Sequence, residues 1–141
     1  MSQSTIQVQI VSAEKDLFNG AATLVVATAT LGEIGILPGH APLLAQLKPG
    51  QVRLHLADKT EEIFYISGGF IEVQPDLIII LADTAERAEN MDEAAALAAQ
   101  ERAKQLLQKQ AVDIDYARAR AELAEAAAQI AAIRRIRKLT K

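Results

Sequence analysis

Polar and apolar residues alternate in the first half of the chain, as they do in strands that are buried on one face. Residues 6–10 follow this period of two, and so do residues 52–56. Other short apolar runs occupy residues 24–26, 63–66, 70–73 and 77–81. Many short strands at close spacing indicate a sandwich or a flattened barrel, and we expect roughly eight to ten strands.

Glycine and proline separate these runs. Asn19-Gly20 is typical of a tight hairpin, because both residues adopt positive φ readily. Pro49-Gly50 is typical of a type II turn, and residues 57–60 and 74–77 of commoner turns. No glycine or proline follows Pro75, so the turn-rich part of the chain ends there.

From about residue 90 the chain has a helical pattern. Asn90 followed by Glu93 resembles a capping box, which predicts a first helix over residues 90–110. The pattern is then interrupted, and either Asp113 or Asp115 can cap a second helix. The two helices are expected to form a hairpin.

Both predicted helices carry a narrow apolar stripe. In the second helix the stripe is Tyr116, Ala119, Leu123, Ala126, Ile130 and Ile133, and the opposite face holds Arg118, Glu122, Glu125 and Gln129. In the first helix it is Met91, Ala94, Ala95, Ala98, Ala99, Ala103 and Leu106. Alanine forms helices readily but buries about a third of the apolar surface of leucine. We therefore expect a hairpin that leaves the β body at modest cost, the alternative being a permanently folded one.

Charge is divided unevenly along the 141 residues. The net charge is −3, yet the last sixteen residues contain five cations and no acid: Arg134, Arg135, Arg137, Lys138 and Lys141. Cations favour a helix C-terminus, so such a cluster is either solvated or docks on an acidic protein surface. The chain has no cysteine, which suits a reducing compartment. Neither a signal peptide nor a bilayer-spanning run is expected.

Catalytic and metal-binding patterns are not evident. Glu61 and Glu62 are neighbours on a strand and point to opposite faces, so they cannot act as an acid–base pair. His40 has no further ligands near it in the sequence, and residues 32–39 do not match a phosphate-binding loop. We expect no catalytic residue and no metal site.

Several motifs occur in order along the chain and together resemble one family. They are residues 32–44 (GEIGILPGHAPLL), 67–75 (SGGFIEVQP), 81–85 (LADTA) and 113–116 (DIDY). Residues 11–14 with Phe18 and Gly20 continue the match. This set resembles the epsilon subunits of bacterial F-type ATP synthases.

The resemblance implies an α+β fold, with a β-sandwich of about ten short strands over residues 1–86 and an antiparallel two-helix hairpin over 87–141. It implies a non-catalytic rotor-stalk subunit that couples the c ring to the gamma subunit of a proton-translocating ATP synthase. Such a protein is peripheral, on the cytoplasmic face of the bacterial inner membrane. The implied partners are gamma, the c ring, alpha and beta, with no nucleic acid.

The resemblance also assigns roles to single residues. A loop with Glu33 would face the c ring, and His40 would lie at the gamma interface. The hairpin would either fold against the body or extend along gamma and block ATP hydrolysis. In the extended state the tip cations would meet acidic segments of beta; these are Arg134, Arg135, Arg137 and Lys138.

Some relatives bind ATP on the folded hairpin through a motif that ends in Arg-Ala. Here residues 91–96 read MDEAAA, so Ala95 replaces the arginine and a phosphate partner is lost. The residues that could still belong to such a site are Glu86, Asp92, Arg102 and Arg118. We expect weak or no ATP binding and no cofactor.

Two other classes of protein remain open from the residues alone. A β module with a basic helical tail could bind nucleic acid, although the tail lacks aromatic side chains for stacking. A small enzyme is disfavoured, because no catalytic constellation is evident.

Overall fold

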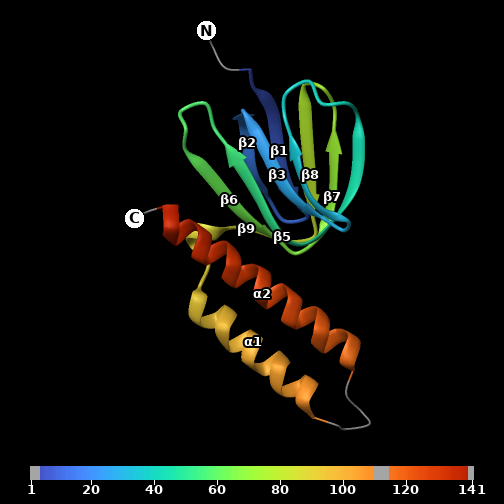
Figure 1. Ribbon diagram of the computed structural model, residues 1–141, viewed down its shortest axis with the longest axis vertical. Coiled ribbons are helices and arrows are strands. Elements are labelled where there is room, and N and C mark those ends of the chain that lie inside the picture. Colours follow the sequence, from blue (N-terminus) through green and yellow to red (C-terminus); the bar gives the residue numbers. More distant parts are fainter. Residues whose placement is uncertain (1–3, 110–114, 140–141) are drawn as a thin grey trace.

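The computed structural model describes residues 4–109 and 115–139. It contains a β-sandwich that carries a two-helix arm, as Figure 1 shows. The strands are β1 Ile6–Ser12, β2 Asp16–Ala22, β3 Leu24–Ala29, β4 Gly32–Ile36, β5 Leu43–His55, β6 Glu61–Ile66, β7 Gly69–Val73, β8 Leu77–Ala82 and β9 Ala85–Arg87. The helices are the 3₁₀ helix η1 Ala88–Asn90, α1 Glu93–Gln108 and α2 Tyr116–Leu139. The predicted α+β class is confirmed, with nine strands in the described residues.

Strand β5 joins the two layers of the sandwich. The strand order is β2-β1-β8-β7-β5-β3-β4, and β6 pairs with both β5 and β9. The first half of β5 pairs with β7 through 43–47, and its second half pairs with β6 through 50–55. One 13-residue strand therefore belongs to both layers, and the apolar residues between the layers form a single core.

The predicted turn at Pro49-Gly50 is wrong, because both residues lie inside β5. They mark the place where β5 passes from one layer to the other. A Cβ on Gly50 would lie 2.6 Å from the Cβ of Thr28, so the missing side chain lets β3 approach closely. The β3–β5 register shifts between Ala27 and Ala29 at this place. Proline and glycine here permit a bend within a strand.

The predicted hairpin at Asn19-Gly20 is also wrong, because β2 continues through these residues and Gly20 pairs with Val8. The β1–β2 turn comes earlier, where the Ser12 amide donates to the Lys15 carbonyl at 2.9 Å. A Cβ on Gly20 would lie only 3.0 Å from the Phe18 ring. The other two predicted turns, 57–60 and 74–77, are confirmed.

The sandwich core is aliphatic, and Phe64 is its largest fully buried side chain. Gly69 lies at the most crowded backbone position. Its φ is +135°, and a Cβ there would lie 2.1 Å from the Leu81 carbonyl oxygen. Only glycine fits this contact between β7 and β8 without displacing the backbone.

The arm begins with a cap that differs from the predicted capping box. Asn90 ends η1, and Asp92 is the N-cap of α1, its carboxylate accepting from the amides of Ala94 and Ala95 at 2.9 and 3.3 Å. Asp115 caps α2 by accepting from the Arg118 amide at 3.0 Å. The other candidate cap, Asp113, lies outside the described residues.

Helix α2 lies between α1 and the sandwich, so two of its sides are covered (Figure 1). Its predicted stripe is buried at Ala119, Ala126, Ile130 and Ile133, and Ala132 is buried as well. Part of the face that was predicted to be polar and exposed, Glu125 and Gln129, is half-buried.

The stripe predicted for α1 is confirmed only in part. Ala103 is buried and Met91 and Ala99 are half-buried, but Ala94, Ala95 and Ala98 are exposed, and the buried Ala96 was not in the predicted stripe. Alanine occurs on almost every side of this helix, so the pattern alone does not decide which side packs.

Candidate functional site

The apolar contact between arm and body is small. We call the surface where α2 meets β5 and β6 the seam. Its buried cluster contains Ile63 and Tyr65 of β6, Ala88 of η1 and Ala132 of α2. Ala132 is fully buried, and the partly buried Ala128 and Ile136 of α2 pack against the same cluster. Because two of these three α2 residues are alanines, which bury little surface, apolar burial holds the arm on the body only modestly here.

Tyr65 brings a phenol into the seam. Its side chain is almost fully buried, and within the described residues its hydroxyl makes no well-formed hydrogen bond. Burial and the nearby Glu125 raise the pKa of Tyr65 to about 12, with Gln129 acting weakly in the opposite direction. Docking of the arm therefore favours the neutral form of the Tyr65 phenol.

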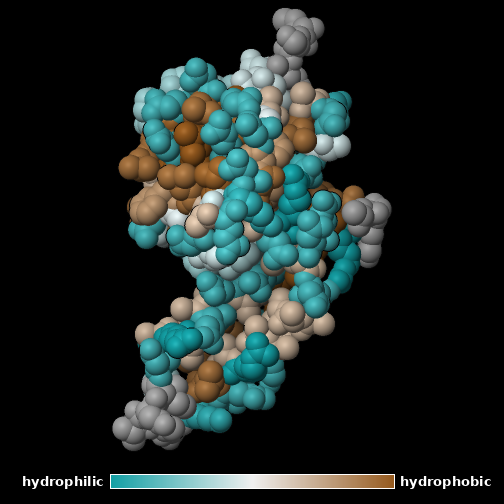
Figure 2. Space-filling model, turned by 180° about the vertical axis from the view of Figure 1, so that it is seen from behind, coloured by the Kyte–Doolittle hydropathy of each residue, from teal (hydrophilic) through white to brown (hydrophobic). Residues whose placement is uncertain are grey.

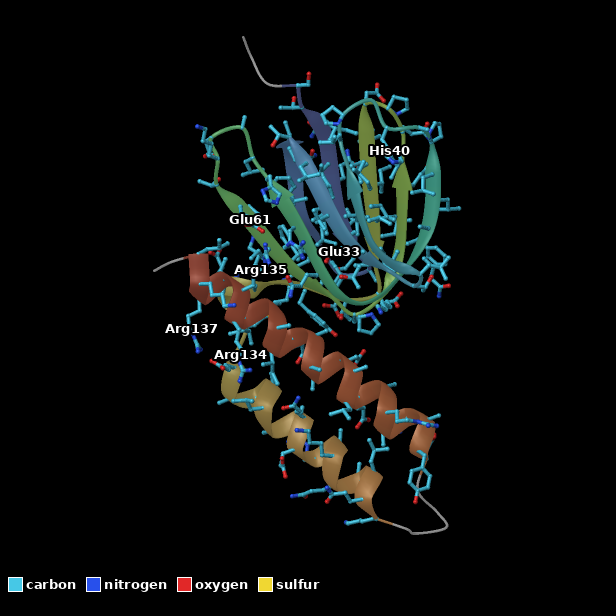
Figure 3. All side chains as sticks on the ribbon, in the orientation of Figure 1. Glu33, His40, Glu61, Arg134, Arg135 and Arg137 are labelled. Atoms are coloured by element: carbon cyan, nitrogen blue, oxygen red, sulfur yellow. The ribbon has the colours of Figure 1, made fainter. Side chains whose placement is uncertain are left out.

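Charged groups join arm and body at Glu61. Its carboxylate lies 3.3 Å from Nε of Arg135 on α2, and 3.8 Å from Nε of Arg53 on β5. The His55 imidazole lies 4.0 Å away. Glu61 is only 11% exposed, so solvent screens these interactions incompletely. Figure 3 shows Glu61 and Arg135 on facing sides of the seam.

Arg53 extends this network to the other edge of the sheet. Its two terminal nitrogens donate to the Glu33 carboxylate at 3.1 Å each, a bidentate pair. The hydrogen bonds from Arg53 hold the pKa of Glu33 below its usual value. Glu33 lies in β4 and not in the predicted loop, because pairing with Thr28 extends the β3–β4 hairpin past it.

Glu93 joins the start of α1 to the end of α2, at the end of the hairpin opposite the connection between the two helices. This residue opens α1, and its carboxylate pairs with Arg137 and lies 3.8 Å from Nε of Arg134, both near the end of α2. Antiparallel packing places the positive end of the α1 dipole beside the negative end of α2. Each charge thus also suits the helix that carries it.

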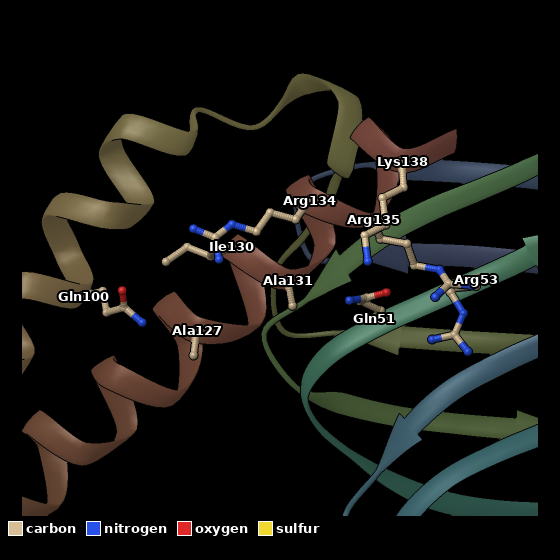
Figure 4. Close-up of a pocket in the computed structure, with 9 residues that line it drawn as sticks. All are labelled: Gln51, Arg53, Gln100, Ala127, Ile130, Ala131, Arg134, Arg135 and Lys138. Carbon is tan, nitrogen blue, oxygen red and sulfur yellow. The ribbon is translucent and has the colours of Figure 1, made fainter. Parts of the chain in front are cut away.

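A cavity of about 460 Å³ lies beside these pairs (Figure 4). It is lined by Gln51, Arg53, Gln100, Ala127, Ile130, Ala131, Arg134, Arg135 and Lys138. Three of its four cations pair with carboxylates of the chain, so much of its positive charge is neutralised internally.

The predicted tip cations are therefore not simply solvated. Arg134, Arg135 and Arg137 pair with glutamates of the same chain, and Lys138 is exposed beside them. Any anionic partner, a phosphate backbone included, would have to displace these carboxylates to reach the same cations.

A second surface lies on the body away from the arm. Leu44, Phe70 and Leu81 lie on adjacent strands β5, β7 and β8 and are exposed. Leu31, at the turn between β3 and β4, is fully exposed. Figure 2 shows apolar side chains gathered on the body. We call Leu44, Phe70 and Leu81 the outer face.

His40 follows β4, on the side of the body away from the arm (Figure 3). Its amide donates to the Leu37 carbonyl at 3.1 Å, which closes the turn at Pro38-Gly39. Next to this segment is a hollow of about 440 Å³ lined by residues 29–34 and 43–46. The predicted role of His40 at a gamma interface stays a prediction.

The four residual ATP-site candidates are not gathered into one site. Asp92 is engaged as the α1 cap and Arg118 pairs with Glu122, at opposite ends of a hairpin about 24 Å long. Glu86 lies on β9 and Arg102 on the exposed side of α1. In residues 4–109 and 115–139, no hydrogen bond or ion pair joins any two of them.

The described part of the chain contains no group of three or more His, Cys, Asp or Glu arranged to hold a metal ion. None of its helices combines the length and apolar character that crossing a membrane requires.

The sequence interpretation missed the role of Glu61, Glu93 and Arg53. Glu61 was correctly placed on the face opposite Glu62, which pairs with Arg87 at 2.7 Å. The signal that could have found the network is the alternation of β5, which puts Arg53 and His55 on one face. The strand pairing that brings Glu61 opposite His55 was not visible in the sequence.

Comparison with known proteins fits this architecture. Residues 5–88 match the beta-sandwich domain of the ATP synthase delta/epsilon chain, and residues 89–134 match its long alpha-helix domain. The ATP synthase epsilon chain of Nitrosococcus oceani is 55% identical over 134 residues, 95% of this chain and 96% of that protein. The epsilon chain of Legionella pneumophila (strain Lens) is 56% identical over 137 residues, covering 97% and 98%.

Solved structures share the fold at lower identity. A chain of the Euglena gracilis mitochondrial ATP synthase, solved as OSCP/F1/c-ring, matches with a TM-score of 0.82 and 22% identity, covering 92% of this chain and 81% of that one. A chain of the Tetrahymena thermophila central stalk/c-ring matches with a TM-score of 0.64 and 15% identity, covering 94% and 99%.

A β-sandwich followed by a docked two-helix arm is the two-domain class of protein that these family models describe. The chain belongs to the ATP synthase delta/epsilon chain family, as its motifs predicted, and resembles the bacterial epsilon chains over almost its whole length.

Proposed function

We propose that this chain is a non-catalytic subunit of the central rotor stalk of a proton-translocating ATP synthase, coupling the c ring to gamma. The observation that carries the proposal is the match of both parts of the chain, in order, to the two domains of one family. Identities of 55% and 56% to bacterial epsilon chains support it. The complex would hold the chain at the cytoplasmic face of the inner membrane as a peripheral subunit.

The outer face and the turn beside it are the surfaces proposed for assembly. Leu44 and Phe70 expose apolar area on neighbouring strands, which suits a permanent protein contact, and we assign this surface with His40 to gamma. The β3–β4 turn, with Leu31 exposed and Glu33 beside it, is assigned to the c ring.

A capture assay with purified gamma subunit tests the assembly surface. Phe70→Glu together with Leu44→Glu should weaken capture at least tenfold, because two charges would be buried in an apolar contact. Leu97→Glu is the matched control, since Leu97 is also exposed but lies on the arm. Capture that survives the double change would contradict this assignment.

The arm is proposed to inhibit ATP hydrolysis when it leaves the body, with its basic tip, Arg134, Arg135, Arg137 and Lys138, meeting acidic segments of beta. The weak apolar contact at the seam supports an arm that moves. A chain that ends at Asn90 keeps β9 and η1 and should assemble normally. ATP hydrolysis by the assembled enzyme should then rise; hydrolysis that stays at the original level would contradict inhibition by the arm.

We also propose that the chain binds ATP weakly or not at all. Ala95 is exposed where the motif of some relatives has arginine, and Asp92 and Arg118 are engaged elsewhere. Calorimetric titration of the isolated chain with ATP should show no saturable binding. A micromolar dissociation constant would contradict the proposal.

A further inference from the structure

Two glutamates bind the arm's arginines inside the chain. Glu61, on the body, lies 3.3 Å from Arg135. Glu93, at the start of α1, pairs with Arg137 and lies 3.8 Å from Arg134. We call the first contact the body lock and the second the hairpin lock. They act on different joints, because α2 packs on the body and α1 packs on α2.

The body lock is the better shielded of the two. Glu61 is 11% exposed and Arg53 14%, and Arg53 is itself held by Glu33. Glu61 therefore lies between two guanidinium groups, one from the body and one from the arm. Loss of its charge would leave Arg53 and Arg135 facing each other with no carboxylate between them. Removing one partner of a shielded pair destabilises more than removing an exposed one.

Docking also changes the charge that the arm presents. The tip carries Arg134, Arg135, Arg137 and Lys138, four cations, and after Glu125 α2 contains no acid. In the docked arm Glu61 and Glu93 lie against these cations, so the local charge is +2 (four cations minus two carboxylates); leaving the body removes Glu61, and opening the hairpin removes Glu93 as well. An acidic partner surface is thus attracted more strongly to a released tip than to a docked one.

We propose that Glu61 and Glu93 form an internal acidic receptor for the arm's arginines and compete for them with an acidic surface on a partner protein. The internal receptor follows from the ion pairs alone, whatever the function of the protein. The competition with a partner rests on the proposed inhibitory function. The partner's carboxylates and the chain's own glutamates are alternative occupants of the same side chains. The internal pairs thereby set how often the arm is available.

Hydrogen exchange on the isolated full-length chain tests the receptor. Glu61→Gln should accelerate amide exchange in both α2 and α1 by about three- to tenfold, with the strands unchanged, because α1 follows α2 off the body. Glu93→Gln should accelerate exchange mainly in α1. Glu122→Gln is the matched control, since Glu122 pairs only within α2, with Arg118.

The double variant and a double-mutant cycle make the test decisive. Exchange in α1 and α2 that stays at the unmodified rate when both glutamates are replaced would overturn the internal receptor. Arg135→Gln alone should also accelerate exchange in α2 and α1, and Glu61→Gln combined with Arg135→Gln should accelerate it by less than the two single effects together. Fully additive effects would count against a direct contact.

ATP hydrolysis by the assembled enzyme tests the competition. Glu61→Gln should deepen inhibition about twofold or more, because the arm is released more often. If the chain ending at Asn90 raises hydrolysis but Glu61→Gln leaves it unchanged, the competition is overturned and the proposed function stands. If that shortened chain also leaves hydrolysis unchanged, the proposed inhibitory function itself fails.

Discussion

The guanidinium of Arg87 lies 5.0 Å from the centre of the Phe64 ring, at the point where the body gives way to the arm. The same side chain donates to Glu62 at 2.7 Å and to the Leu17 carbonyl at 3.0 Å. Arg87 thereby ties β9 to β6 and to β2. Arg87 is the last residue of β9, and the chain passes from it into η1 and the arm.

Arg87→Ala should lower the free energy of unfolding by about 2–3 kcal/mol, because a charged hydrogen bond, a backbone contact and a cation–π contact are lost together. Urea denaturation followed by circular dichroism measures this. Arg118→Ala, whose side chain is 78% exposed, is the control and should change stability by less than about 0.5 kcal/mol. Equal effects would mean that Arg87 is not the clamp at the junction.

Gly69→Ala should prevent stable folding or cost more than about 3 kcal/mol, because its Cβ would overlap the Leu81 carbonyl at 2.1 Å. Gly32→Ala provides a matched comparison. Gly32 has almost the same φ, +134°, but nothing lies within 4 Å of an added Cβ, so only backbone strain of about 1–2 kcal/mol is expected. Thermal unfolding of the two variants separates crowding from strain, and similar losses would contradict this explanation.

Ala132→Phe should release the arm from the body. Ala132 is fully buried in the seam, and overpacking a buried site costs about 1–3 kcal/mol, which the arm avoids by undocking. Exchange in α2 should therefore rise while the melting temperature of the sandwich stays unchanged. Ala124→Phe, on the exposed side of the same helix, should leave both quantities as they were. If the sandwich melts at a lower temperature while the α2 amides stay protected from exchange, the arm does not undock and the prediction is contradicted.

Alkaline pH should weaken arm docking through Tyr65. Its pKa is raised from 10.0 to about 12 in the folded chain, so the folded state holds the proton more tightly than the unfolded state. The stabilisation is fully present below pH 10 and is lost as pH rises from about 10 to about 12. The loss amounts to up to about 3 kcal/mol.

Tyr65→Phe should remove this pH dependence, because phenylalanine cannot ionise, while keeping the packing. Arm exchange, corrected for the intrinsic rate at each pH, should then stay level across that range. An unchanged alkaline transition in the Phe variant would assign it to another group.

The motifs were sufficient to predict the family and the two-part architecture, but not the exact turns. Asn19-Gly20 and Pro49-Gly50 are sound local turn signals, and both lie inside strands. In the first case the Phe18 ring occupies the space over Gly20, and in the second β3 approaches Gly50. Long-range packing overrode the local preference at both places.

The site was predicted in part. The basic tip was identified from the sequence, because its four cations are close neighbours along the chain and no acidic residue lies among them. Its internal partners were not identified, since Glu61 and Arg135 are 74 residues apart and meet only through the fold.

The sequence by itself determined the order of a turn-rich strand region and an alanine-rich helical region, because glycine and proline occur only up to Pro75 and alanine favours helix in the part of the chain beyond residue 90. It also determined that the helices carry little apolar surface. The tertiary structure decided which side of each helix is buried and which glutamates meet the tip arginines. Alanine-rich helices present nearly equivalent sides, and ion pairs form wherever strand pairing and docking bring the charges together.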